Sequence, residues 1–398
     1  MTQLPVLYGM PGSLYTGKVR SYLRKQRIAF EERPAGDPRF REEIVPQIGR
    51  WIIPVLQMPD GTLLQDGAAI IDHFEANAAL LGLTQRPRAL PQDAVLAVLA
   101  HVFELFGGEG LLRPAMHYRW NFDADNLDFL RADFCAGLAP GASADEQRAI
   151  FDLASKRMRQ ATLAFGVTPQ TIATIEHSYA DFLGRLDHHL AHTPYLLGDT
   201  PTLADYGLIA PLYAHLARDP HPASLMKRTA PRVWRWVEHM NSPDAEIGEY
   251  LGRSSRWLDI GLDGETLPSL ENLLAFVAQD YLPEIAAYVS FTDAWLASRP
   301  DMPAGSNGMP KPGDRQIGIT QLIWRGQAID VMVMPYRLYL LQRVQDAAER
   351  LDTTDTARLQ ALLDRSGLTS LLTLKCRRRV LRQGHLEVWG PSNPLREA

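Results

Sequence analysis

Two hydroxyl side chains lie in a turn near the start of the chain, where they could take part in chemistry. The stretch YGMPGSLYTGKVRSYL runs from a strand end through a turn that holds Ser13 into a basic amphipathic helix with Thr16 at its mouth. A hydroxyl at a helix N-terminus can cap the helix, or it can donate a hydrogen bond to an anion that the positive helix end attracts. Tyr8, at the end of the preceding strand, offers a third hydroxyl, although aromatic residues in strands commonly pack in a core. These residues alone leave both roles open.

Two other clusters have the residue types of binding sites but lack the surrounding pattern. His188 and His192 are four residues apart and would share one face of a helix, a spacing that can hold zinc. No HExxH pattern surrounds them, so we interpret this segment as a surface helix and predict no metal site. Lys375–Arg379 is a short basic run in a chain of formal net charge -5, which favours a solvated face over a nucleic-acid patch.

The first 80 residues contain the elements that must position the hydroxyls. Apolar or alternating runs in PVLYG, IAFEERP and WIIPVLQMPDGTLLQ predict strands, and the PDG turn predicts a hairpin within the last run. Helical patterns cover the segments TGKVRSYLRKQ, RFREEIVPQIGR and DGAAIIDHFEAN. The resulting order, β-α-β-α-β-β-α, predicts a mixed four-stranded sheet that helices cover.

The rest of the chain divides into a helical region and a less regular one. A linker with several prolines, Thr84–Asp93, precedes helical patterns that continue to about residue 262 and are long enough to pack as a bundle. Beyond it we predict helix with a break near Pro283, a Pro/Gly-rich loop at Pro300–Asp314, two strands around RGQ, a further helix and a terminal hairpin in RRRVLRQGHLEVWG. The predicted domains are residues 1–83, 90–262 and 263–398.

The composition is that of an ordinary globular protein and excludes several classes. The net charge of -5 gives no reason to expect nucleic acid or an acidic membrane as a partner. The two cysteines, Cys135 and Cys376, exclude a disulfide framework and favour a reducing compartment. We see no signal peptide and no run approaching the ~18 apolar residues of a membrane span, so we expect a cytoplasmic protein.

Three segments together resemble the glutathione S-transferase superfamily. LYGMPGSLYTGKVRSYL is similar to its first strand, active-site turn and first helix, and IIPVLQMPDGTLLQDGAAIIDHF to its cis-proline, hairpin and third helix. LLGDTPTLADYGLIAPLY is similar to the N-capping box and buried helix of its helical domain, with Thr202 and Asp205 as the box. The resemblance implies a thioredoxin-like α/β domain followed by an all-helical bundle over roughly the first 260 residues. Residues 263–398 are then an additional α+β extension.

The resemblance implies that Ser13 activates the thiol of glutathione, with Tyr8 and Thr16 as alternatives. A thiol reacts as its thiolate, and a free thiol has a pKa near ~8.5. A hydroxyl that donates to the sulfur, together with the positive end of the helix, would lower that pKa.

The resemblance also implies the residues that bind glutathione. A cis Ile53–Pro54 bond would turn the Ile53 backbone outward to pair with the peptide, and Arg50 would lie near its glycine carboxylate. Asp66 would attract the γ-glutamyl ammonium, and the Gly67 N–H would hold the neighbouring carboxylate. The family usually has Glu-Ser where this chain has Asp66-Gly67, and the missing serine hydrogen bond would weaken binding about ten- to a hundredfold.

In relatives, the segment LLRPAMHYRWNF walls the pocket for the electrophile, which makes His117, Arg119 and Trp120 candidates here. Packing between helices is the alternative role for these three residues.

The reaction implied is that of a glutathione transferase-like enzyme, a cytoplasmic homodimer that joins the thiol to a small electrophile without a metal. Two alternatives stay open. One is a non-catalytic binding protein of the same fold, which the Asp66-Gly67 departure and the extension favour. The other is a glutathione-dependent isomerase, lyase or peroxidase, which would share the same site residues.

Overall fold

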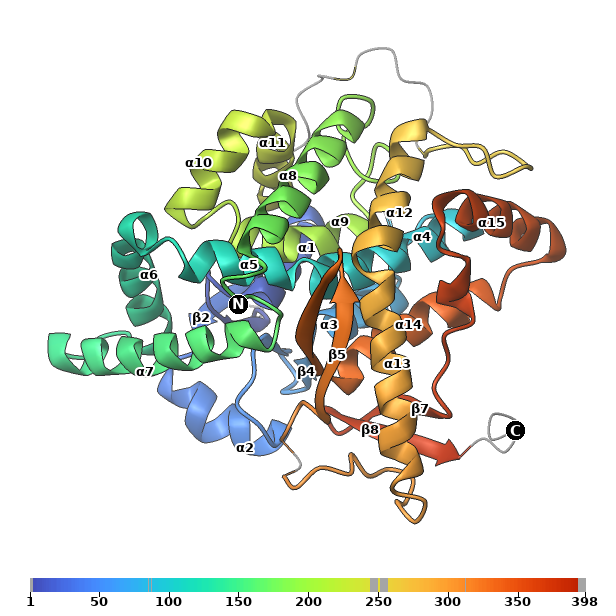
Figure 1. The fold of residues 1–398 in the computed structure, drawn as a ribbon. Coiled ribbons are helices and arrows are strands. Elements are labelled where there is room, and N and C mark those ends of the chain that lie inside the picture. Colours follow the sequence, from blue (N-terminus) through green and yellow to red (C-terminus); the bar gives the residue numbers. More distant parts are fainter. Residues whose placement is uncertain are drawn as a thin grey trace.

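The N-terminal part of the protein is a mixed four-stranded sheet, as the sequence predicts (Figure 1). This computed structural model describes residues 3–84, 86, 88–243, 250, 257–311 and 313–392. The strands are β1 (Val6–Gly9), β2 (Glu31–Pro34), β3 (Val55–Gln57) and β4 (Leu63–Gln65). Their order is β2-β1-β3-β4, with β1 and β2 parallel and the other pairs antiparallel.

Helical elements cover both faces of this sheet. They are α1 (Leu14–Lys25), the π-helical turn η1 (Phe40–Ile44), α2 (Val45–Ile48) and α3 (Gly67–Ala76). Alternate strand residues point to opposite faces. Leu7 and Leu56 pack with α1 and α3 in the main core, whereas Tyr8 and Val55 pack with η1 and α2 in a separate cluster. Because α1 follows β1 after one turn, its N-terminus lies beside the end of that strand.

A helical region follows, again as predicted. It contains α4 (Ala94–Leu105), the π-helical turn η2 (Phe106–Gly110), α5 (Leu112–Trp120), α6 (Asp123–Leu138), α7 (Ala144–Leu163), α8 (Ile172–His189), α9 (Leu203–Ala214), α10 (Pro220–Thr229) and α11 (Pro231–Asn241). The capping box that the sequence predicts at the start of α9 is present, with Thr202 and Asp205 bonded reciprocally.

One segment of this region is more apolar than the sequence analysis recognised. Residues 94–120 are long and apolar enough to span a membrane by length and composition, with a mean hydropathy of 1.6 over 18 residues. In the structure, 94% of that window is buried inside the protein, as is usual for a core helix. The segment therefore gives only weak evidence for a membrane span.

The last third of the chain adds helices and two hairpins. Its elements are α12 (Pro268–Asp280), α13 (Leu282–Ala297), β5 (Gly318–Trp324), β6 (Gln327–Val333), α14 (Pro335–Ala348), α15 (Thr353–Ser366), η3 (Thr369–Leu372), β7 (Arg378–Gln383) and β8 (Leu386–Ser392). The helix break, the two strands around RGQ and the terminal hairpin are where the sequence predicts them. We call residues 263–398 the extension.

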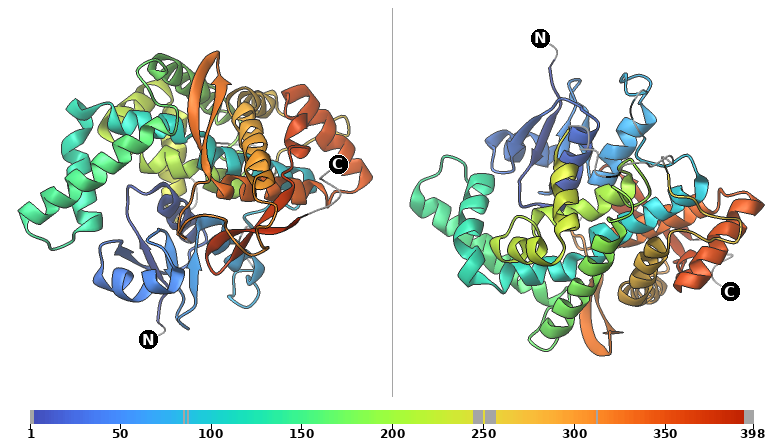
Figure 2. Two further views of the ribbon diagram at one scale, coloured as in Figure 1. Left: turned by 60° about the horizontal axis from the view of Figure 1, so that its bottom comes forward. Right: turned by 90° about the horizontal axis from the view of Figure 1, so that it is seen from above.

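The extension packs against both earlier parts of the chain. Helix α14 lies along α4, and the β7–β8 hairpin lies beside the N-terminal sheet (Figure 2). Apolar residues from all three parts, such as Leu7, Leu99 and Leu341, belong to one core cluster. The boundaries at residues 83 and 262 remain predictions from the sequence.

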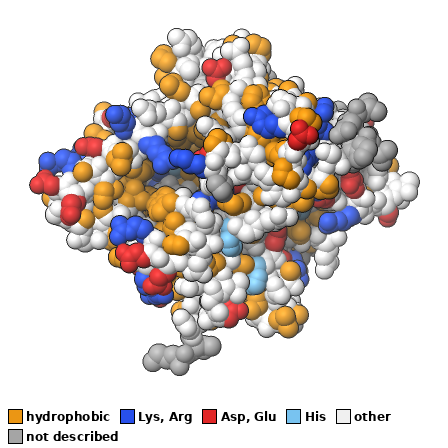
Figure 3. All heavy atoms as spheres, turned by 90° about the horizontal axis from the view of Figure 1, so that it is seen from below, with side chains coloured by type: hydrophobic (Ala, Val, Ile, Leu, Met, Phe, Trp, Pro, Cys, Tyr) orange, Lys and Arg blue, Asp and Glu red, His pale blue; other side chains and the backbone are white. Residues whose placement is uncertain are grey.

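The outer surface carries both apolar and charged side chains. On the face shown in Figure 3, apolar side chains gather in a hollow that Lys and Arg side chains border.

Candidate functional site

Ser13 lies at the N-terminus of α1, where an anion could bind. It is the N-cap residue, with φ -89° and ψ 125°, and its Oγ accepts a hydrogen bond of 3.3 Å from the Thr16 N–H. Ser13 as a whole residue is partly exposed, and the first turn of α1 has no acidic residue. Because Oγ acts as the acceptor in this bond, its own hydrogen can still be donated to an incoming anion.

The two alternative hydroxyls are fully buried. Tyr8 is 0% exposed and stacks on Phe40, with ring centroids 5.4 Å apart. Burial raises the pKa of the Tyr8 phenol, so the phenol stays protonated. Thr16 is also 0% exposed. Of the three candidate residues, Ser13 is the one that is partly exposed.

The Ile53–Pro54 peptide bond is cis, as the resemblance implies. Pro54 immediately precedes β3, and its carbonyl accepts a hydrogen bond of 3.3 Å from the Asp66 N–H. The segment before β3 is thereby joined to the residue that begins α3.

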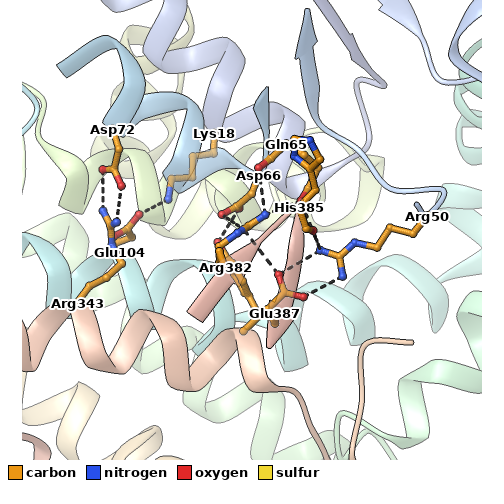
Figure 4. Close-up of polar contacts among 11 residues, drawn as sticks. Lys18, Arg50, Gln65, Asp66, Asp72, Glu104, Arg343, Arg382, His385 and Glu387 are labelled. Atoms are coloured by element: carbon orange, nitrogen blue, oxygen red, sulfur yellow. Dashed lines mark hydrogen bonds and ion pairs between the residues drawn. The ribbon is translucent and has the colours of Figure 1, made fainter. Parts of the chain in front are cut away.

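Asp66 has an unusual backbone and unusual partners. It is the N-cap of α3, yet its φ is 93° and its side chain does not cap the helix. A residue other than glycine in this region has a strained backbone, at a cost of about 1–3 kcal/mol. Its carboxylate instead accepts hydrogen bonds from the Tyr336 hydroxyl and from Arg382 Nη1, both at 2.7 Å. Figure 4 shows the pair of Asp66 and Arg382. Both partners belong to the extension.

The surroundings of Gly67 are tight for any side chain at this position. A Cβ atom on Gly67 would lie 3.1 Å from Cδ of Lys18, which is closer than most such contacts. Lys18 is held there by a buried ion pair of 2.5 Å with Glu104. Burial raises the pKa of Glu104, but Lys18 and Arg343 outweigh that effect and hold the pKa well below its usual value. The buried lysine therefore leaves little room for a larger residue than glycine.

Arg50 also binds the extension. Its guanidinium donates to both carboxylate oxygens of Glu387, at 2.9 and 3.1 Å, and to the His385 carbonyl at 2.9 Å. Only 6% of the Arg50 side chain and 7% of the Glu387 side chain are exposed. Burial raises the pKa of Glu387, but its bonds to Arg50 reverse this and leave the pKa below the usual value. The pair is buried, charged and bidentate.

A small cavity remains between these residues. Its lining comprises Tyr15, Arg50, Ile52, Ile53, Pro54, Gln65, Asp66, Arg315, Tyr336, Arg382 and Glu387. The volume open to water is about 20 Å³, which is enough for roughly one water molecule. Four of the five predicted binding residues, Arg50, Ile53, Pro54 and Asp66, thus line one space together with residues of the extension, whereas Gly67 does not line it.

Tyr15 is a cavity residue that the sequence analysis missed. Its hydroxyl donates a hydrogen bond of 2.7 Å to Glu109, and the other carboxylate oxygen of Glu109 accepts from Arg337 at 3.0 Å. Burial and the Glu109 charge raise the pKa of Tyr15 well above its usual value, so it remains a neutral phenol. A signal was present in the sequence, since Tyr15 follows Ser13 by two residues and Glu109 lies in a GGEG interruption of an apolar helix.

The candidates for an electrophile pocket lie inside the helical region. His117, Arg119 and Trp120 are at most 3% exposed. Arg119 forms an ion pair with Asp219 at 2.7 Å and donates to the Gly12 carbonyl at 2.9 Å. It therefore anchors the turn that holds Ser13. None of the three lines the cavity beside Asp66, and their role in an electrophile pocket stays a prediction.

The structure offers no metal site in the part of the chain that it describes. His188 and His192 contact each other through their rings, with centroids 5.1 Å apart. No group of three or more His, Cys, Asp or Glu side chains among the described residues is placed to hold a metal ion.

Two family models match the sequence. Residues 7–84 match the N-terminal domain of glutathione S-transferase, and residues 169–239 match the C-terminal domain. A search of curated proteins found no match.

Solved structures of this family also align with the chain. Glutathione transferase GSTFuA3 from Phanerochaete chrysosporium is 16% identical, with 62% of this chain and 100% of that chain covered and a TM-score of 0.43. The beta-etherase LigF from Sphingobium sp. strain SYK-6 is 16% identical, with 61% of this chain and 95% of that chain covered and a TM-score of 0.41. A glutathione S-transferase from Methylobacillus flagellatus KT with glutathione bound is 18% identical, with 59% of this chain and 93% of that chain covered and a TM-score of 0.33. TM-scores below 0.5 support no inference about this chain, so its likeness to this family rests on the two family models.

Proposed function

Because this chain belongs to the glutathione S-transferase superfamily, we propose that it activates the thiol of glutathione, or of a similar thiol, for reaction with a small electrophile. The observation that carries the proposal is the position of the partly exposed Ser13 as the N-cap residue of α1. A donor in that position stabilises a sulfur anion but does little for a neutral thiol.

The proposed reaction has two steps. The thiol proton leaves to solvent, and the thiolate is held by the Ser13 hydroxyl and the positive end of α1. The sulfur lone pair then forms a bond to an electrophilic carbon, and either a leaving group departs with its electron pair or the adduct takes up a proton. Each unit by which the thiol pKa falls corresponds to ~1.4 kcal/mol of preference for the anion.

We further propose that the peptide binds along the segment before β3. The Ile53 backbone would pair with it in the manner of an added strand. Arg50 would hold the glycine carboxylate, Asp66 the γ-glutamyl ammonium, and the Gly67 N–H at the start of α3 the carboxylate beside that ammonium.

Replacement of Ser13 by alanine tests this proposal. We expect the Ser13→Ala variant to lose at least about tenfold in kcat/KM on a panel of electrophiles with glutathione, because one hydrogen bond to an anion is removed. Ser143→Ala is the matched control, since Ser143 also caps a helix but lies exposed at the start of α7. Full activity in Ser13→Ala would contradict the assignment.

A non-catalytic binding protein is the second candidate. It is favoured by the partners of Arg50 and Asp66, which are already paired with Glu387 and Arg382 from the extension. In this case wild-type protein would turn over no electrophile on the panel and would bind no glutathione in calorimetry.

Several finer features belong to the proposal. Cys135 and Cys376 are buried and form no disulfide, which is consistent with a cytoplasmic location, and the family resemblance suggests a homodimer. Light scattering of the purified chain would test the dimer. An isomerase, lyase or peroxidase that uses the same thiolate would appear in the same assays as turnover on its own class of substrate.

A further inference from the structure

The β7–β8 hairpin carries opposite charges on one side of its tip. Arg382 on β7 and Glu387 on β8 are cross-strand partners, and their charged groups lie 3.7 Å apart. Figure 4 shows both side chains pointing toward the N-terminal part of the protein, Arg382 toward Asp66 and Glu387 toward Arg50. The hairpin thus presents a cation to Asp66 and a carboxylate to Arg50.

These are the charges that the proposed ligand would present. Glutathione has an ammonium group at its γ-glutamyl end, for Asp66, and a carboxylate at its glycine end, for Arg50. The hairpin fills both places with groups of the same sign. The cavity of about 20 Å³ leaves no room for a tripeptide beside the hairpin.

The base of the hairpin is anchored in the protein interior. Gln342 of α14 bonds to both the N–H and the carbonyl of Val380, at 2.8 and 2.9 Å. Val380 and Trp389 are each 1% exposed. At the tip, Gln383 and Gly384 are exposed, and the turn joins the strands without a buried apolar residue. The tip is held instead by polar contacts, which are the two ion pairs, the bonds from Arg382 to Gln65 and the bond from Arg50 to the His385 carbonyl.

Uncovering the site has an electrostatic requirement. A buried charge that loses its partner is strongly destabilised, whereas an exchange of partners of the same sign keeps the charge balance. A ligand that carries both an ammonium and a carboxylate can replace both ion pairs at once. A small uncharged thiol can replace neither.

We propose that the tip of the β7–β8 hairpin, residues 382–387, occupies the thiol-peptide site as an internal counterpart of a zwitterionic peptide, and that such a peptide binds by displacing it. This inference rests on the function proposed above. The expected ligand is a thiol with separated ammonium and carboxylate groups. Its apparent affinity depends on the fraction of molecules in which the tip is displaced. When the competent state is a fraction of the population, the apparent Kd is the intrinsic Kd divided by that fraction.

Calorimetry on a charge-neutral tip tests the inference. In the full chain, Arg382→Gln with Glu387→Gln keeps the side-chain lengths and removes both ion pairs. We expect this double variant to bind glutathione at least about tenfold more tightly than wild type. Arg379→Gln is the matched control, because Arg379 also lies on β7 but pairs with Asp346, away from the site. The control should bind as wild type does, and 2-mercaptoethanol should not compete in any of the three proteins.

Hydrogen exchange gives a second readout that does not depend on activity. In wild-type protein, saturating glutathione should speed amide exchange in residues 382–387 and leave exchange at Val380 and Trp389 unchanged. Affinity in the double variant equal to or weaker than wild type, or slower exchange at the tip with ligand, would overturn the inference while glutathione binding itself stands. If no variant binds glutathione, the proposed function fails, and the inference fails with it.

Discussion

Two buried aspartates at the starts of helices have different roles, one in the N-terminal region and one in the helical region. Asp205 belongs to α9 and accepts hydrogen bonds from the Leu196 and Thr202 N–H groups and from the Trp236 indole. Asp66 precedes α3 in a strained conformation, does not cap its own helix, and binds groups 270 and 316 residues further along the chain. The first carboxylate serves local structure, whereas the second faces a cavity.

The difference lies in the exchangeability of the partners. The donors to Asp205 are neutral groups of the core, and no incoming molecule can replace them. One of the donors to Asp66 is the charged Arg382, whose place any other cation can take. A strained backbone at a residue that faces a cavity is typical of a functional site.

Loss of the Asp205 carboxylate should have the largest effect on stability. Asp205→Ala leaves four buried donors without this acceptor, and each costs about 1–3 kcal/mol, so we expect a loss of at least about 4 kcal/mol. Urea unfolding measures it. Glu146→Ala in the exposed capping box of α7 is the control and should lose much less. Equal losses would show that burial is not what makes the α9 box strong.

Removal of Arg50 should come next. Arg50→Met leaves Glu387 buried without its bidentate partner, and we expect a loss of about 3 kcal/mol in the free energy of unfolding. The double variant Arg50→Met/Glu387→Met should recover most of that loss, because it removes both charges. Urea unfolding of the single and double variants would test this, and additive losses would contradict the ion pair as described.

The Asp66 backbone strain should be visible when two small residues are compared. Asp66→Ala and Asp66→Gly both remove the carboxylate, but only glycine accepts a φ of 93° without strain. We expect the alanine variant to lose about 2 kcal/mol and the glycine variant about 1 kcal/mol less than that. Thermal unfolding would show it, and a glycine variant less stable than the alanine variant would argue against strain at this position.

The contributions of Asp205 and Glu387 to stability should depend on pH with opposite signs. Burial raises the pKa of Asp205 to about 6, so its favourable contribution is present below its unfolded pKa near 3.8 and is lost as the pH rises through 6. The pKa of Glu387 lies below 4.5, so its contribution is present above 4.5 and is lost as the pH falls through the folded pKa. Urea unfolding from pH 3 to 8 gives the free energy of unfolding as a function of pH. We expect Glu387→Gln to reduce the pH dependence only on the acid side, and Asp205→Asn to reduce it only between pH 4 and 6. Identical profiles for both variants would refute this contrast.

The smallest effect on stability should come from Ser13. Its capping bond is long, at 3.3 Å, so Ser13→Ala should lose only about 0.5–1 kcal/mol. A melting temperature within a few degrees of wild type, together with lost activity, would separate chemistry from capping. A large loss of stability would instead make Ser13 a structural residue.

The sequence predicts those parts of the molecule that local patterns encode. The strand and helix order of the first 80 residues, the break at Pro283 and the RGQ hairpin all have local signals, and the structure confirms them. Arg325 and Gly326 in that hairpin both have positive φ, as a tight turn between strands requires. The cis Pro54 followed from the resemblance rather than from any local preference.

The contacts between the extension and the candidate site could not be predicted from local patterns. Arg50 and Glu387 are 337 residues apart, and no periodicity relates a charge on one element to its partner on another. The strain at Asp66 comes from tertiary contacts, since Asp-Gly by itself indicates only a turn. Helix α15 was not predicted, although its ends have local signals in the sequence: Asp352 caps its start, and Gly367 follows its last residue in the left-handed conformation.

The pKa of the bound glutathione thiol is the most direct test of the central claim. Thiolate absorbance of saturated protein, titrated between pH 5 and 10, should give a thiol pKa at least about one unit below the ~8.5 of a free thiol in wild type. The same titration of Ser13→Ala should return the pKa most of the way to the free value. An identical pKa in the two proteins would contradict the assignment of Ser13 as the group that holds the sulfur anion.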